Sequence, residues 1–175
     1  MTAPSRELRR PSSDVRLPTS DFRPPRIDVV RVTNPADRLA ALEIRRRVFA
    51  EEQDAPDLRV ADPDDPRSII ALASFRAADP SGDPWPVATG RLTPSLIRGG
   101  QALIAWVATL PEVRGFGAGE AVMRFLLAEA ERSGAREVAL AAQIPAEGFY
   151  RRLGFVAAGP VYDVRGIPHR RMVRG

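Results

Sequence analysis

The sequence predicts an α/β domain in which a mixed sheet is flanked by helices on both faces. The chain has 175 residues, of which 44% are hydrophobic, and this suits one packed domain better than two. Apolar runs alternate with helical periodicity in the order strand, helix, three strands, helix, strand, helix and strand pair. Two of these runs, 68–77 and 85–92, are joined by a linker rich in Asp, Pro and Gly. Such a linker is typical of a hairpin, so we expect the first half of the sheet to be antiparallel.

The first elements follow from β-branched residues and a proline turn. Residues 27–32 are rich in Val and Ile, which favours a strand. Asn34 and Pro35 mark the start of a helix, and apolar residues continue at helical spacing to residue 50. Aspartates and prolines dominate residues 51–67, which predicts a loop. Its closely spaced aspartates are expected to form a polar turn rather than a cation site, because the full calcium-loop pattern is missing.

The second half of the chain predicts the remaining strands and helices. An amphipathic helix carries Val122, Met123 and Leu126 on one stripe and ends near Gly134. The other expected elements are strands at 102–110 and 138–142, a short helix at 144–153, and paired strands at 155–158 and 170–174.

Composition excludes several classes of function. Every one of the 26 basic residues is arginine, but the net charge is only +4, too small to predict nucleic-acid binding. Cysteine is absent and His169 is the single histidine, so we expect no disulfide, no thiolate nucleophile and no metal site. No apolar run is long enough to span a membrane and no signal peptide is evident, which predicts a cytoplasmic protein without a membrane partner.

Residues 1–25 are expected to form an arm outside the domain, which then covers 26–175. The arm is rich in Pro, Ser and Arg and has no apolar periodicity. A solvated or loosely docked tail is the simpler interpretation, and binding to an acidic partner or a neighbouring subunit is the alternative.

The glycine-rich turn before the long helix predicts a phosphate site. Residues 114–119 are Arg-Gly-Phe-Gly-Ala-Gly and follow an apolar strand. Backbone N–H groups of such a turn and of the first helical turn converge on an anion at the positive end of the helix dipole. Glycines let a pyrophosphate approach the backbone, and Arg114 adds a fixed charge beside it. Alone, this pattern also fits an ordinary turn.

Two linked motifs give the chain a resemblance to the GNAT superfamily of acyl-CoA-dependent N-acyltransferases. The run 114–119 matches the glycine signature of that superfamily, and 146–155, Ala-Glu-Gly-Phe-Tyr-Arg-Arg-Leu-Gly-Phe, is similar to its second element. The segments 47–53, 90–92, 142–143 and 166–169 are similar to the ElaA-type subgroup of acetyltransferases. The resemblance implies a GNAT-like mixed sheet that splays open, with acetyl-CoA or another short acyl-CoA as co-substrate and no metal.

The resemblance also assigns a donor site. In the superfamily the strand before the glycine turn splays from the strand after the long helix, so Trp106, Val107, Ala108 and the region 141–142 are expected to form the walls of the gap. A backbone N–H of Val107 or Ala108 would polarise the thioester carbonyl. Trp106 is also a departure from the subgroup, and its ring would narrow the acyl or acceptor channel. The expected cofactor-binding residues are Val107, Ala108, Arg114, Gly115, Phe116, Gly117, Ala118, Gly119, Glu120, Phe149 and Tyr150.

Three residues are candidates for catalysis. Tyr150 lies where the superfamily places a tyrosine that donates to the departing thiolate, although a tyrosine there can also serve only for packing. Glu52 is near the acceptor site by resemblance and would take a proton from the amine, or be a solvated surface carboxylate. His169, in a loop beside a strand, is the alternative base, since imidazole exchanges protons near neutral pH. The expected acceptor-binding residues are Phe49, Gln53, Arg91 and Gln143.

The leading function is direct acyl transfer from acyl-CoA to a small-molecule amine in a ternary complex. Because cysteine is absent, the obvious covalent carrier is absent too. Acyl-homoserine-lactone synthesis is a second enzymatic interpretation, but the intact glycine turn and Tyr150 argue against it. A non-catalytic acyl-CoA sensor or interaction module is the alternative outside enzymes. Exposed sheet edges and the arm are compatible with a homodimer.

Overall fold

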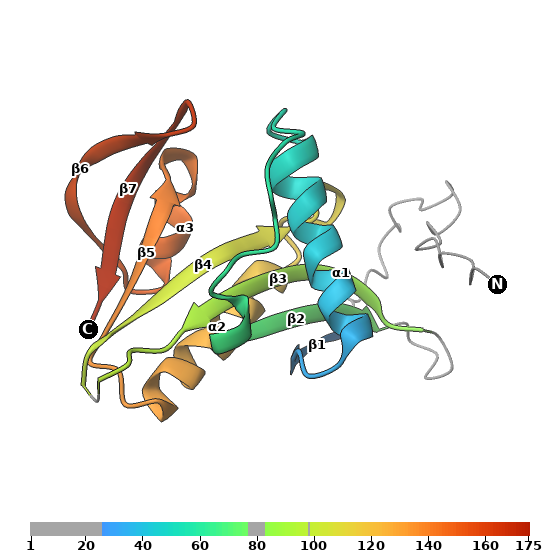
Figure 1. Cartoon of the computed structure of the whole chain (residues 1–175), viewed down its shortest axis with the longest axis horizontal. Coiled ribbons are helices and arrows are strands. Elements are labelled where there is room, and N and C mark those ends of the chain that lie inside the picture. Colours follow the sequence, from blue (N-terminus) through green and yellow to red (C-terminus); the bar gives the residue numbers. More distant parts are fainter. Residues whose placement is uncertain (1–25, 77–82, 98) are drawn as a thin grey trace, which may run out of the picture.

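The structure, a computed structural model, describes residues 26–76, 83–97 and 99–175, so the arm at 1–25 lies outside the described residues. Within them, seven strands form one sheet in the order β1-β2-β3-β4-β5-β7-β6 (Figure 1). The strands are β1 (Arg26–Arg31), β2 (Ile69–Arg76), β3 (Trp85–Thr93), β4 (Gln101–Thr109), β5 (Glu137–Gln143), β6 (Val156–Val164) and β7 (Ile167–Arg174). Only the β4–β5 pair among these is parallel, which confirms the mixed sheet with an antiparallel first half.

Helices cover both faces of this sheet. The helices and turns are α1 (Pro35–Arg45), π-helical η1 (Arg46–Glu51), η2 (Asp65–Arg67), η3 (Pro111–Val113), α2 (Ala118–Arg132), η4 (Ile144–Ala146) and α3 (Glu147–Arg152). Figure 1 shows α1 in front of the sheet and α2 behind it. Val122 and Leu126 of α2 are fully buried, and a Cβ at Gly90 in β3 would lie within 2.9 Å of both side chains. The missing side chain at Gly90 therefore allows α2 to pack closely on the sheet.

The first five strands lie within one residue of their expected bounds, whereas the last two are longer than expected. They continue to Val164 and begin again at Ile167 because Arg165 and Gly166 both have positive φ, as in the tight hairpin turns that match strand twist. The Gly166 N–H also donates to Asp163 Oδ1 at 2.8 Å. The first helix also differs from expectation, since its last turn, η1, is π-helical rather than α-helical. This wider turn brings Val48 and Ala50 into buried positions.

The β4 and β5 strands pair over only part of their length. Residues Gln101 to Ile104 pair with Glu137 to Leu140, and the later residues of each strand pair only with their other neighbours, β3 and β7. The parallel pair is therefore open at its carboxyl end. The α2 helix begins beside this opening, and η1 ends beside it (Figure 1). None of the described helices is long and apolar enough to cross a membrane.

Candidate active site

The glycine turn leads into an uncapped helix. Gly115 and Gly117 both have φ of +87°, a conformation that L side chains rarely adopt, and Gly117 is the N-cap residue of α2. No side chain caps the first N–H groups of the 15-residue α2 helix. A Cβ at Gly119 would lie 2.8 Å from Thr109 Oγ1. The turn thus presents backbone N–H donors at the positive end of a long helix, an arrangement that suits the binding of an anion.

Arg114 beside this turn is held by a carboxylate. Its guanidinium donates to both oxygens of Glu52 at 2.8 and 2.6 Å and to the Thr109 carbonyl at 3.2 Å. The hydrogen bonds to Glu52 raise the pKa of Arg114. A second ion pair of opposite polarity, Arg47 with Glu112 at 2.9 Å, links the same two segments. The end of η1 is therefore tied electrostatically to the chain that precedes α2.

Tyr150 lies in an aromatic cluster next to the glycine turn. It is 8% exposed, and its ring packs edge-on against Phe149 and Phe155. The Phe149 ring in turn reaches within 3.9 Å of where a Cβ of Gly119 would stand. Burial raises the pKa of Tyr150 to about 12, so the phenol is protonated at neutral pH. Its hydroxyl makes no hydrogen bond within the described part of the chain, so it can donate a hydrogen bond to a bound ligand.

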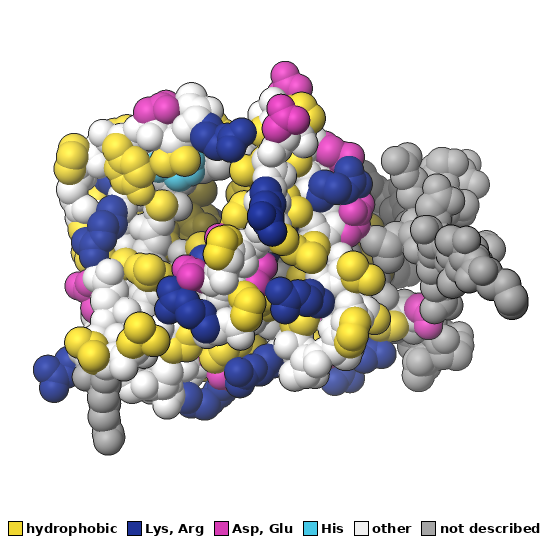
Figure 2. All heavy atoms as spheres, viewed as in Figure 1, with side chains coloured by type: hydrophobic (Ala, Val, Ile, Leu, Met, Phe, Trp, Pro, Cys, Tyr) yellow, Lys and Arg dark blue, Asp and Glu magenta, His cyan; other side chains and the backbone are white. Residues whose placement is uncertain are grey.

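A cavity of about 500 Å³ lies between the β5–β7 strands and the end of η1. Phe49, Gln53, Gln143 and His169 line it together with Trp106. Figure 2 shows the corresponding hollow, with hydrophobic side chains in its depth and the histidine on one wall. Gln143 and His169 are cross-strand neighbours in β5 and β7, and Gln143 Nε2 donates across the cavity to Gln53 Oε1 at 3.4 Å.

The contacts of His169 define which ring nitrogen can act. Its Nδ1 lies 2.8 Å from the Ile167 carbonyl oxygen, and Tyr162 stacks on the ring. A carbonyl oxygen only accepts hydrogen bonds, so Nδ1 carries a proton in this contact. The neutral imidazole then has its lone pair on Nε2, which is free to accept a proton or a hydrogen bond.

A buried charge network contacts Trp106, one of the residues that line the cavity, and the sequence analysis missed it. Arg45 is fully buried and donates to both oxygens of Asp65 at 3.1 and 2.9 Å, while Arg91 pairs with Asp62 and lies 3.5 Å from Asp65. Burial lowers the pKa of Arg45, and the hydrogen bond with Asp65 opposes that effect. The expected polar turn of aspartates is present, since Asp62 Oδ1 accepts from the Asp64 N–H, but two of its carboxylates face the interior. The one sequence feature that could have predicted this network is the position of Arg45 on the apolar face of its helix.

The structure groups the expected site residues unevenly. The cavity collects Phe49, Gln53, Gln143 and His169, whereas Glu52 and Arg91 are not among its lining residues. Arg91 is 6% exposed and forms ion pairs with two carboxylates.

The residues expected on the donor side lie around the start of α2 and in β4. Glu120 pairs with Arg124, and Phe116 packs edge-on against Phe75. Ala108 and Ala118 are buried, and Val107 is half-buried in β4. No group of three or more metal-ligating side chains occurs in the ranges that the structure describes.

Comparisons with known proteins agree with this architecture. Residues 95–174 match the family described as "Acetyltransferase (GNAT) domain". The uncharacterized protein YyaT of Bacillus subtilis is 29% identical over 153 residues, which are 85% of this chain and 95% of YyaT. An acyl-CoA N-acyltransferase from Pseudomonas aeruginosa has a TM-score of 0.72 at 29% identity, and Escherichia coli ElaA has 0.72 at 25%. The match covers 86% of this chain and 100% of the other in both cases.

Proposed function

From the premise that this chain carries a GNAT acetyltransferase domain of ElaA-like fold, we propose that it transfers an acetyl or other short acyl group from acyl-CoA directly to a primary amine. The observation that carries the proposal is the meeting of two half-sites at the open end of the β4–β5 pair. The uncapped start of α2 lies at one side, and the cavity with His169 lies at the other. A donor thioester and an acceptor amine would meet in the gap between them.

The donor half-site fits the diphosphate of coenzyme A. Backbone N–H groups of residues 117–120 and the Arg114 guanidinium would bind its oxygens. Because the Arg114 guanidinium donates to Glu52 in the structure, the diphosphate would compete with the Glu52 carboxylate for that guanidinium. The pantetheine arm would then follow the edge of β4 that does not pair with β5, where a backbone N–H of Val107 or Ala108 would face the developing oxyanion.

The reaction needs two proton movements. The amine nitrogen attacks the thioester carbon and loses a proton, and the C–S bond breaks as the amide forms. His169 Nε2 is the base that the cavity favours, since His169 lines it and its Nδ1 is already committed. Tyr150, protonated at neutral pH, donates to the departing thiolate of coenzyme A. Gln53 and Gln143 orient the amine, and Glu52 serves as the counter-ion of Arg114 until the donor binds.

Thiol release tests this function. Acetyl-CoA and a panel of primary amines are incubated with the protein, and a disulfide reagent reports free coenzyme A without background, because the chain has no cysteine. We expect amine-dependent release that falls with His169→Ala. Calorimetric binding of coenzyme A without any turnover would instead favour the non-catalytic sensor, and absence of binding would reject both.

A further inference from the structure

Trp106 adopts a backbone conformation that its residue type disfavours. Its φ is +57°, at the place where the pairing of β4 with β3 shifts register between Thr89 and Arg91. A bulky residue in this region is strained and persists only where its surroundings fix it. Neighbouring side chains must therefore hold Trp106 in this conformation.

Three contacts fix the indole. Its Nε1–H donates to Asp62 Oδ2 at 2.8 Å, the Arg45 guanidinium lies 5.2 Å from the ring centroid, and the Phe49 ring meets it edge-on at 5.2 Å. Asp62 and Arg45 are themselves held by the buried charge network, the first through Arg91 and the second through Asp65. Every member of the network thus contacts the indole directly or through one partner.

Fold stability alone does not account for this network. Buried ion pairs often contribute no more than a well-packed apolar cluster of the same volume, because desolvation offsets their attraction. Arg45 also leaves Nε and Nη2 buried without hydrogen-bond partners. Such a costly arrangement around one strained aromatic residue indicates a positioning role.

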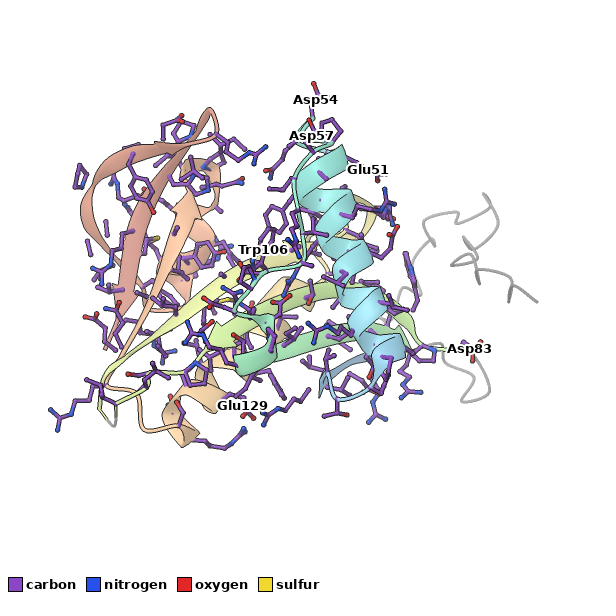
Figure 3. The ribbon with its side chains drawn as sticks, in the orientation of Figure 1. Glu51, Asp54, Asp57, Asp83, Trp106 and Glu129 are labelled. Carbon is purple, nitrogen blue, oxygen red and sulfur yellow. The ribbon has the colours of Figure 1, made fainter. Side chains whose placement is uncertain are left out.

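The positioned ring faces the acceptor cavity. Trp106 and Phe49 form an aromatic wall there, and Leu58, Val164 and Ile167 add apolar surface. The acidic residues among those that line the cavity are Asp54 and Asp57, both exposed. Figure 3 shows these two at the outer end of η1, away from Trp106, which lies between η1 and the β5–β7 strands. Arg165 is the opposing rim charge, so acidic rim groups outnumber basic ones.

We propose that Trp106 determines acceptor choice by forming, with Phe49, an aromatic wall for a primary amine carried on a flat apolar group, an arylalkylamine. This rests on the proposed function. The rim carboxylates attract the cationic amine as it approaches, and inside the cavity the indole and phenyl rings pack against its apolar stem while the amine reaches His169. A polyamine is expected to bind less well, because it carries no flat apolar group to pack against the Trp106 and Phe49 rings.

Kinetics with matched acceptors test the proposal. We compare phenethylamine with spermidine at saturating acetyl-CoA for the wild type, Trp106→Ala and Trp85→Phe, a control that lies in β3 against Phe75. We expect the wild type to prefer phenethylamine. Trp106→Ala should raise its KM about tenfold and leave the KM for acetyl-CoA within about twofold. Asp62→Asn, which loosens the indole without removing it, should raise the same KM by a smaller factor and leave kcat nearly unchanged.

Direct binding separates this proposal from the proposed function. The chain has two tryptophans, so in a Trp85→Phe background the tryptophan fluorescence, excited selectively over that of tyrosine, comes from Trp106 alone. We expect phenethylamine, and not spermidine, to change that emission, even if no acyl transfer occurs. If Trp106→Ala does not fold, Trp106→Leu, which keeps apolar volume but has no aromatic ring, serves in its place for the kinetic comparison. Unchanged emission, or a KM ratio between the two amines that the Trp106 variants leave as in the wild type, overturns the proposal.

Discussion

Substitution of Glu52 by Gln should strengthen the binding of coenzyme A. In the structure Glu52 accepts two hydrogen bonds from Arg114, and the diphosphate has to replace it. The side chains are 37% and 47% exposed, so the pair resembles a surface ion pair worth about 0.2–1 kcal/mol. Because that energy is lost when the donor binds, Glu52→Gln should lower the Kd for coenzyme A by a factor of about 1.4 to 5.

The same variant tests which residue is the base. Glu52 does not line the acceptor cavity, whereas His169 does. We therefore expect kcat of Glu52→Gln to stay within about threefold of the wild type, whereas loss of a general base costs about 10²–10⁴-fold. A fall of that size would move the base role from His169 to Glu52.

Calorimetry measures the donor effect, and Glu51→Gln is the matched control. Glu51 is the neighbouring residue, carries the same charge and pairs with Arg46 instead of Arg114. The control should bind coenzyme A as the wild type does, and the difference between the two variants should shrink at high salt. Weaker binding by Glu52→Gln, or equal binding by both variants, would refute the competition between Glu52 and the diphosphate.

Three further predictions concern the buried groups. Asp65→Asn should lower the free energy of unfolding by about 3–5 kcal/mol, measured with urea, because it leaves Arg45 buried without its carboxylate; a loss below about 1 kcal/mol would contradict this. Tyr150→Phe should lower kcat with little change in the KM for acetyl-CoA, and the wild-type pH profile should show no alkaline loss assignable to Tyr150 below about pH 10, since its pKa is about 12. Burial would raise the pKa of Asp62, but hydrogen bonds from Trp106, the Asp64 N–H and Arg91 outweigh it and lower the pKa from 3.8 to about 2. Its stabilising contribution is therefore present above about pH 4 and lost as the pH falls toward 2, a dependence that Asp62→Asn should flatten.

Local patterns predicted most of the fold. The strands up to β5 follow from apolar runs bounded by turns, and their bounds were close to those observed. The ends of β6 and β7 were missed because Arg165 and Gly166 close a two-residue turn in a polar segment without a strong turn signature. The opening between β4 and β5 was expected from the family resemblance, not from periodicity, since it depends on how far two distant segments stay paired.

Some features of the candidate site could be predicted from neighbouring sequence. The glycine turn before the long helix is present, and four of the residues predicted to bind the acceptor or the proton, Phe49, Gln53, Gln143 and His169, line one cavity, although their roles stay predictions. The network around Trp106 was not predicted, because it joins Arg45 to Asp65 and Asp62 to Trp106 across 20 and 44 residues. These side chains meet through the packing of η2 against β3 and of α1 against β3 and β4.

Titration of coenzyme A into the isotope-labelled protein, followed through the backbone amide resonances, tests the donor site without requiring turnover. We expect saturable shifts that are largest for residues 115–120, at the uncapped start of α2, and that weaken in Arg114→Ala. No saturable binding, or shifts confined to other segments such as β1 and β6, would contradict the claim that this turn holds the donor's diphosphate.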